Sequence, residues 1–274
     1  MRADKTILVF RKDWREISRN WEVILPIVIV PLLFSILFPI LVTMAPSLAS
    51  MPESSLSNIK AMIRILPGPM KDDLIGMTNE QTIIYILAIY IFAPTFLIIP
   101  IMASSVIASD SFAGEKERKT IEALFATPIS DSELFMGKIM VCFIPAMTIT
   151  LTSFMVYSTI IDVLSFSVFG GKLLFPNLIW ILLIFGLAPA VALGSIGLTV
   201  MISAKVRGFR EAQQISAMLL IPIMILILGQ ASVATMLGPI VIGGLVCVFA
   251  IVDSVIFHFA MGTFRREEIL EKIA

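Results

Sequence analysis

Long apolar runs alternate with short polar segments along this chain. Five runs contain no Asp, Glu, Lys or Arg, namely 23–52, 81–109, 139–161, 173–204 and 212–252. A helix of about 20 residues crosses a hydrocarbon core of about 30 Å. Each run is therefore long enough to span a membrane, and the pattern predicts an all-α membrane protein with several spans.

The run 212–252 is too long for a single span. As one helix it would measure about 60 Å, twice the thickness of the hydrocarbon core. Gly229 and the pair Gly238-Pro239 indicate a break within it, so we divide it into two spans. The prediction is then six transmembrane helices, near 22–44, 81–108, 139–161, 178–203, 213–229 and 239–261.

Composition supports the membrane assignment. Hydrophobic residues make up 58% of the 274 residues and charged residues only 15%, with a mean hydropathy of +0.99. A soluble domain carries about 25% charged residues, because its surface faces water. The formal net charge is zero, which gives no support to a nucleic-acid partner. We therefore expect the lipid bilayer to be the main surrounding of this chain.

Lys and Arg gather on one side of the predicted membrane. Sixteen of the 20 fall in the segments 1–21, 109–138, 204–212 and 262–274. Basic residues are retained in the cytoplasm when a membrane protein inserts. We therefore expect the protein to lie in the cell membrane, with both termini and residues 109–138 on the cytoplasmic side. Residues 45–80 are then expected to form an extracytoplasmic loop.

Residues 1–21 are predicted to form an amphipathic helix. Large apolar residues recur at spacings of 3, 4, 3 and 4, with Lys and Arg on the other faces: Ile7, Phe10, Trp14, Ile17 and Trp21. Such a helix lies in the membrane interface, with tryptophan at the level of the headgroups. The alternative is a charged anchor without regular structure.

Residues 109–138, SDSFAGEKERKTIEALFATPISDSELFMGK, form a polar island between the second and third predicted spans. From 114 to 127 its charges have helical spacing. Glu115 precedes Arg118 and Lys119 by three and four residues, and Glu122 follows them by four and three. Each such pair stabilises a helix by about 0.2–0.5 kcal/mol. The alternative is a solvated loop that covers the ends of the spans.

The second half of the polar island adds an apolar patch and two boundaries. Ile121, Leu124 and Phe125 lie on one helical face. Pro128 ends the predicted helix, because the residue before a proline is pushed out of the helical region. Residues 130–133, Ser-Asp-Ser-Glu, fit a capping box that starts the third span.

The polar island resembles the signature of the type-2 family of ATP-binding-cassette (ABC) transporter permeases. In that family a Glu-x-Glu-Arg-x-Thr-Ile/Leu-Glu run precedes Leu-x-x-x-Pro-Ile/Val-Ser, and Glu and Gly-Lys follow at the next span. Lys119 departs from the pattern, because members often have glycine there. The matching residues are Glu115, Glu117, Arg118, Thr120, Ile121, Glu122, Leu124, Pro128, Ser130, Glu133, Gly137 and Lys138.

The resemblance implies that 1–274 form one permease domain and that the helix within 109–138 is a cytoplasmic coupling helix. In the family this helix docks in a groove of a cytoplasmic ATPase. Two ATPase subunits and a second permease, identical or homologous, would complete the assembly, and most members are exporters. The docking residues implied here are Glu115, Glu117, Arg118, Lys119, Thr120, Ile121, Glu122, Leu124, Phe125 and Pro128.

This chain has no ATP-binding loop of the form Gly-x-x-x-x-Gly-Lys-Ser/Thr. Its two Gly-Lys pairs, at 137–138 and 171–172, are followed by Ile139 and Leu173. We therefore expect ATP and Mg²⁺ to bind in the partner subunit, and we predict no catalytic residue, cofactor or metal site in this chain.

A few residues within the predicted spans are candidates for special roles. Asp253, with Ser254 beside it, is an acidic residue deep inside a span and could belong to the translocation pathway. The alternative is a neutral or hydrogen-bonded structural carboxyl group. Asp110 lies at the end of a span, where we expect it to be solvated. The small residues Gly186, Ala190 and Gly194 form a stripe that lets helices pack closely.

Two other classes of function remain open from the residues alone. A secondary transporter or channel driven by an ion gradient usually has two related halves with ionisable residues in both, whereas this chain has no convincing internal repeat. An intramembrane zinc protease needs His-Glu-x-x-His, which a chain with one histidine cannot form. Other intramembrane enzymes are the least favoured class.

Overall fold

The computed structural model describes residues 3–48, 73–74, 76–120, 129–206, 208–229 and 238–263. These residues are helical or irregular, and none of them belongs to a strand. Six helical stretches are long and apolar enough to cross a membrane: Trp21–Ser47, Asn79–Glu117, Asp131–Ser165, Leu178–Ser203, Phe209–Gly229 and Pro239–Gly262. The predicted fold class and the number of spans are confirmed.

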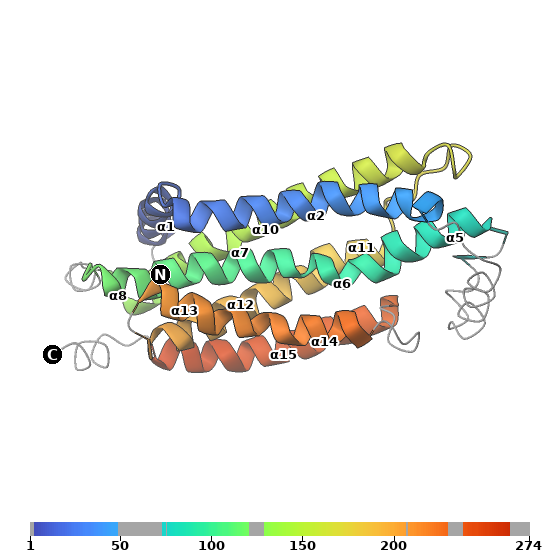
Figure 1. The fold of residues 1–274 in the computed structure, drawn as a ribbon. Helices are drawn as coiled ribbons and strands as arrows, with labels where there is room; N and C mark the ends of the chain where they lie inside the picture. The colour runs from blue at the N-terminus through green and yellow to red at the C-terminus, as the bar shows by residue number, and fades with distance from the viewer. Residues whose placement is uncertain are drawn as a thin grey trace.

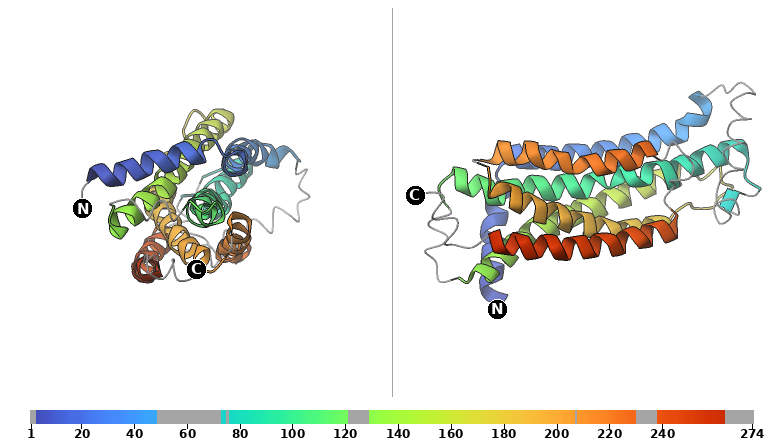
Figure 2. Two further views of the ribbon diagram at one scale, coloured as in Figure 1. Left: turned by 90° about the vertical axis from the view of Figure 1, so that its left-hand side faces the viewer. Right: turned by 90° about the horizontal axis from the view of Figure 1, so that it is seen from below.

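The six spans form an elongated bundle with the second span at its centre (Figures 1 and 2). Within that span, α7 (Ile98–Ser109) packs against α2 (Trp21–Leu48), α10 (Asp131–Ser165) and α12 (Ala188–Ser203). The outer helices α14 (Ile221–Gly229) and α15 (Pro239–Thr263) complete the bundle, and α15 packs on α12.

The N-terminal helix α1 (Ala3–Ile17) lies across one end of this bundle, nearly perpendicular to the spans (Figure 2). We call this the α1 end. The predicted amphipathic helix is thus present, but it ends at Ile17, and Trp21 begins α2 instead. Its buried face consists of Thr6, Val9, Asp13 and Ile17, whereas Ile7 and Trp14 are exposed. The predicted apolar stripe therefore coincides only in part with the face of α1 that packs against the bundle.

The second span is a chain of helical segments rather than one regular α-helix. In order these are α5 (Asn79–Tyr85), the π-helix η1 (Ile86–Ile91), α6 (Phe92–Phe96), α7, the π-helix η2 (Asp110–Gly114) and α8 (Glu115–Glu117). Proline at positions 94 and 100 removes backbone donors from the regular ladder, so a change of helix type near these positions is expected. The irregular span nevertheless carries the chain from α5 into the polar island.

An aromatic cluster fills the core of the opposite end. The Trp180 ring, from α11 (Leu178–Leu182), stacks on Tyr157 with centroids 4.9 Å apart and on Phe154 at 5.4 Å. Phe96 meets the same indole edge-on at 5.3 Å. Such ring contacts add to the stabilisation from packing alone. This end is therefore held together by apolar and aromatic contacts from three spans.

Several predicted boundaries shift in the structure. Helix α2 continues to Leu48 and α5 begins at Asn79, so the predicted loop 45–80 includes residues from both helices. The fifth span begins with α13 (Phe209–Ser216), continues through the 3₁₀ turn η4 (Ala217–Leu220) and ends with α14. The division of 212–252 into two helices is confirmed, and residues 230–237 between them lie outside the described residues.

Candidate functional site

The second span carries its helix past the bundle and ends it at Glu117. The backbone N–H of Thr120 donates to the carbonyl of Glu115 at 3.0 Å, and that of Lys119 donates to Lys116 at 3.2 Å. Lys119 has a φ of 57°, in the left-handed region. These bonds are those of a Schellman motif, with Lys119 at the position that favours glycine. A lysine therefore occupies the position where the family often has glycine.

This turn overturns part of the predicted coupling helix. A single helix from 114 to 127 was predicted, but the helix stops at Glu117 because Lys119 leaves the helical region. Glu115 and Arg118, which were predicted to pair along this helix, instead form ion pairs with residues of α1, η2 and α10. Residues 121–128 lie outside the described residues, so the second half of the prediction stays a prediction.

Lys138, on α10, is the centre of a buried ionic cluster at the α1 end. Its side chain is 0% exposed. Its Nζ lies 2.7 Å from Glu115 Oε2 and 3.3 Å from Asp13 Oδ2, and it donates to the Ser111 carbonyl at 2.6 Å. Burial of an isolated ammonium group costs a large desolvation free energy, and these partners offset that cost for Lys138.

Two more cations extend this cluster across the helices. Lys12, on α1, places its Nζ 2.7 Å from Glu115 Oε1. Arg118 lies 3.0 Å from Asp110 Oδ1 and 3.2 Å from Glu16 Oε1. We call the set Lys12, Asp13, Glu16, Asp110, Ser111, Glu115, Arg118 and Lys138 the ionic cluster. It joins α1, the end of the second span and α10 into one unit.

Mutual attraction keeps the cations of the ionic cluster charged. Burial by itself lowers the pKa of Lys12, but the carboxylates of Asp13 and Glu115 outweigh burial and raise that pKa above its ordinary value. Burial likewise lowers the pKa of Arg118, and the hydrogen bond and charge of Asp110 outweigh it and raise that pKa. Both groups therefore remain cationic at any physiological pH.

Three carboxylates of the ionic cluster, those of Asp13, Glu16 and Glu115, lie close enough together to suggest a metal site. However, Lys12 Nζ lies 3.2 Å from Asp13 and 3.4 Å from Glu16, in addition to its contact with Glu115. The lysine ammonium therefore already provides the positive charge that these carboxylates require, and the arrangement does not point to a metal ion.

Glu117 points to another part of the chain. Its Oε2 accepts a hydrogen bond of 2.9 Å from the backbone N–H of Phe209, the first residue of α13. A carboxylate at this position satisfies a free donor and interacts favourably with the helix dipole. A Cβ at Gly208 would lie 2.5 Å from the same oxygen, so the contact depends on glycine there. Glu117 therefore ties α8 to the start of the fifth span.

Gly137 and Lys138, the Gly-Lys pair of the signature, have adjacent structural roles. A Cβ at Gly137 would lie 2.8 Å from the side chain of Val9 and 3.1 Å from the Thr6 carbonyl. The absence of a side chain thus lets α1 cross α10 closely. The next residue, Lys138, then reaches Asp13 on α1. The pair therefore fixes where α1 crosses α10.

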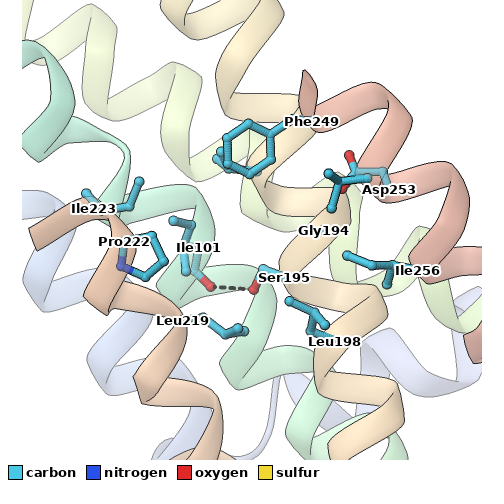
Figure 3. Close-up of a pocket in the computed structure, with 12 residues that line it drawn as sticks. Ile101, Gly194, Ser195, Leu198, Leu219, Pro222, Ile223, Phe249, Asp253 and Ile256 are labelled. Atoms are coloured by element: carbon cyan, nitrogen blue, oxygen red, sulfur yellow. Dashed lines mark hydrogen bonds between the residues drawn. The ribbon is translucent and has the colours of Figure 1, made fainter. Parts of the chain in front are cut away.

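Asp253 occupies a second, separate location, inside the bundle. Its carboxyl group is directed from α15 toward Gly194 on α12 (Figure 3). It borders an apolar cavity of about 100 Å³ between α7, α12, α14 and α15. Asp253 is 6% exposed, and its buried Oδ1 accepts no hydrogen bond from the described residues. Ser254, by contrast, is exposed and donates to the Ala250 carbonyl.

The stripe of small residues in the fourth span faces α15. A Cβ at Gly186 would lie 3.1 Å from Val246, and one at Gly194 would lie 2.6 Å from Asp253 Oδ1. Ala190, between them in the stripe, is 9% exposed. The small side chains thus allow α12 and α15 to approach closely, at the level where Asp253 points inward.

Comparison with known families decides the assignment. A family model described as ABC-2 family transporter protein matches residues 7–266 of the chain. The chain belongs to the ABC-2 transporter family. No curated protein and no solved structure gives a significant match to it. The rival classes, a secondary transporter and an intramembrane enzyme, lose their support from this point.

The ten docking candidates of this ABC-2 transporter protein fall into three groups. Glu115 is buried in the ionic cluster, and Glu117 contacts α13. Arg118 is 38% exposed although it is paired, and Lys119 and Thr120 are exposed. The remaining five docking candidates lie outside the described residues: Ile121, Glu122, Leu124, Phe125 and Pro128.

Sequence reasoning missed the partners that α1 contributes to the site. Asp13 and Glu16 sit in a helix that was interpreted only as an amphipathic helix of the membrane interface. Asp110 was expected to be solvated, but it is 1% exposed and paired with Arg118. One signal was available: Lys138 lies directly before an apolar run, where a lysine that cannot reach water needs carboxylate partners.

Proposed function

We propose that this chain is the membrane-spanning permease subunit of an ATP-driven ABC exporter, coupled to separate ATPase subunits through the polar island. Membership of the ABC-2 family over residues 7–266 carries the proposal. The signature within 109–138 supports it, because in the resembling permeases this segment docks on the ATPase. Export is favoured by the direction in which most members of that family transport.

Within the polar island we assign docking to the part beyond Glu117. The buried carboxylate of Glu115 and the contact of Glu117 with α13 hold the segment to this chain's own helices. Lys119 and Thr120 are exposed. Together with Arg118, Glu122 and the apolar patch of Ile121, Leu124 and Phe125 before Pro128, they form the proposed contact surface.

A docking element transmits force only if it is fixed to the helices that must move. The ionic cluster provides such a mount, because Lys138 and Glu115 join α10 to the second span and Lys12 adds α1. Charged residues beyond the mount would set the register and choice of partner, as charges at interfaces generally do. The two halves of the signature would then have different tasks, mounting and docking.

The orientation and assembly follow from the same proposal. The distribution of Lys and Arg favours cytoplasmic termini and a cytoplasmic polar island in the cell membrane, with 45–80 on the other side. Two ATPase subunits and a second permease, identical or homologous, would complete the transporter. ATP and Mg²⁺ would bind to the ATPase subunits, because this chain lacks a Gly-x-x-x-x-Gly-Lys-Ser/Thr loop.

Purification of the chain from its native membranes in mild detergent, followed by mass spectrometry, tests this proposal. We expect a stoichiometric ATPase subunit with the wild-type chain. Glu122→Lys is expected to lower its retention about tenfold or more, because like charges at an interface are strongly unfavourable. Glu80→Lys is the matched control, because Glu80 is exposed in the first turn of α5, at the opposite end of the second span. A chain that purifies alone, even after crosslinking, would contradict the proposal.

We assign Asp253 to the translocation pathway. The support is its buried Oδ1, which accepts no hydrogen bond within the described part of the chain, and the cavity beside it. Ser254 is exposed on another face of α15, so the assignment does not extend to it. We expect Asp253→Asn to retain the ATPase subunit but to slow ATP turnover of the complex. Normal turnover and normal assembly in this variant would leave Asp253 a structural carboxyl group.

A further inference from the structure

An apolar groove opens where α1 crosses α10. It has a volume of about 190 Å³ and is lined by Phe10 and Trp14 from α1 and by Ile144, Pro145, Thr148 and Ile149 from α10. Both aromatic residues belong to the predicted apolar stripe of α1: Phe10 is half-buried against the core at this end, and Trp14 is 39% exposed. The groove therefore presents apolar surface outward on the side of a membrane-spanning helix, where lipid is the neighbour.

Unpaired cations lie directly beside this groove. Arg11 follows Phe10 and Arg15 follows Trp14, so each begins about 100° around α1 from an aromatic residue of the groove. Both are exposed, and neither guanidinium forms an ion pair with the described residues. They are four residues apart and thus lie on one face of α1, one turn from each other.

Three other cations at the α1 end are paired with carboxylates of the chain. Lys12, Arg118 and Lys138 all belong to the ionic cluster. The two sides of α1 thus differ: one side contacts acidic groups of the protein, and the other combines apolar rings with guanidinium groups that have no ion-pair partner among the described residues. The second combination matches the chemistry of a phospholipid with a negative headgroup, which has acyl chains and a phosphate within one molecule.

We propose that this corner is a binding site for an anionic phospholipid, with an acyl chain in the groove between α1 and α10 and the headgroup phosphate at Arg11 and Arg15. Helix α1 lies nearly perpendicular to the spans (Figure 2), so its axis runs parallel to the membrane surface. Guanidinium groups bind phosphate through paired hydrogen bonds, which favours arginine over other cations in this role.

Quenching of tryptophan fluorescence by brominated lipids tests the site in the full-length chain. The chain has three tryptophans, and Trp180 is fully buried in the aromatic cluster. Trp21→Phe therefore leaves Trp14 as the tryptophan that reports on the groove. This parent protein is reconstituted into vesicles of phosphatidylcholine with a small fraction of brominated phosphatidylglycerol, or of brominated phosphatidylcholine for comparison.

We expect brominated phosphatidylglycerol to quench Trp14 with an apparent affinity about 25-fold higher than that of brominated phosphatidylcholine. Arg11→Gln with Arg15→Gln should remove this preference, at roughly fivefold for each arginine. The matched control, Lys205→Gln with Arg210→Gln, changes the net charge equally at exposed positions outside α1 and should keep the preference. Arg11→Lys with Arg15→Lys should restore a reduced preference.

Three results would overturn the proposal. These are equal quenching by the two lipids in the parent protein, a preference that survives removal of both arginines, and an equal loss in the Lys205 and Arg210 control. The last result would mean that only the overall charge attracts the lipid. Size-exclusion chromatography verifies that each variant is folded, and all four substituted side chains are exposed.

Discussion

The two ends of the bundle are held together by different interactions. At the α1 end, Lys138 is fully buried and bonded to Glu115 and Asp13, from two other helices. At the opposite end, Trp180 is fully buried among aromatic rings from three spans. A buried ion pair requires a specific partner at a specific position. An apolar core, in contrast, tolerates the replacement of one apolar side chain by another of similar volume.

This difference indicates where the molecule needs a defined geometry. In lipid, apolar side chains gain little from being near one another rather than near acyl chains, so packing alone specifies helix positions weakly. A buried ammonium group with two carboxylate partners specifies them strongly, because every alternative arrangement leaves a charge unpaired. The strongly specified end is the one that carries the signature of the permease family.

Removal of the central cation should have the largest effect on stability. We expect Lys138→Met to lower the free energy of unfolding by about 3–5 kcal/mol, because Glu115 and Asp13 lose their buried counter-ion and keep only the ammonium of the partly exposed Lys12. Unfolding by sodium dodecyl sulfate measures the change. Lys172→Met, at an exposed position in the loop after α10, is the control and should have no measurable effect.

A charge-neutral variant distinguishes lost charge balance from lost packing. Lys138→Met combined with Glu115→Gln and Asp13→Asn should recover part of the stability, because no unpaired carboxylate remains. If the triple variant is less stable than Lys138→Met alone, the stability of the α1 end does not depend on charge balance.

Truncation of the central aromatic residue should have a smaller effect at the opposite end. We expect Trp180→Ala to cost about 2–3 kcal/mol, because the cavity left behind destabilises the fold while the transfer contribution is reduced in lipid. The same unfolding titration measures it, with Trp180→Phe as a milder variant. A larger loss for Trp180→Ala than for Lys138→Met would reverse the comparison between the two ends.

A methyl group added at the crossing of α1 and α10 tests their close approach. Gly137→Ala should cost about 1–3 kcal/mol, because its Cβ would meet both the Val9 side chain and the Thr6 carbonyl. Gly243→Ala is the matched control, since no heavy atom lies within 4 Å of a Cβ added there on α15. Equal stability of the two variants would show that the crossing is not tightly packed.

The smallest expected change is a gain in stability. Lys119→Gly should stabilise the protein by about 0.5–1 kcal/mol, because glycine adopts a positive φ without steric cost. Lys119→Ala keeps the steric cost and removes the same side chain, so it should give no gain. An equal gain from both variants would mean that the lysine side chain, rather than its backbone conformation, is unfavourable.

The features that could be predicted from sequence are local ones. The spans follow from apolar runs, and the capping box at Ser130 and Glu133 starts α10 as predicted. The ionic cluster could not be paired from sequence, because Lys138 and Asp13 are 125 positions apart. The prediction instead paired Glu115 with Arg118 along one helix. Without a known fold, contacts between charges can be predicted only for residues close together in the sequence.

The end of the second span was missed for a related reason. A positive φ is usually marked by glycine, and Lys119 gives no such signal. The orientation of Asp253 also required the structure, because sequence alone does not determine that its neighbour across the helix interface is Gly194. Depth in the membrane could be predicted for this carboxyl group, but its surroundings could not.

Crosslinking from single cysteines tests the division of the polar island most directly. With Cys142 and Cys247 replaced by serine, cysteine is introduced at position 115, 119, 122 or 80, and the complex is treated with a short thiol-to-amine crosslinker. We expect covalent products with a separate ATPase subunit from Lys119→Cys and Glu122→Cys, and none from Glu115→Cys or Glu80→Cys. Products from position 115 or 80, or none from positions 119 and 122 in an intact complex, would contradict this division.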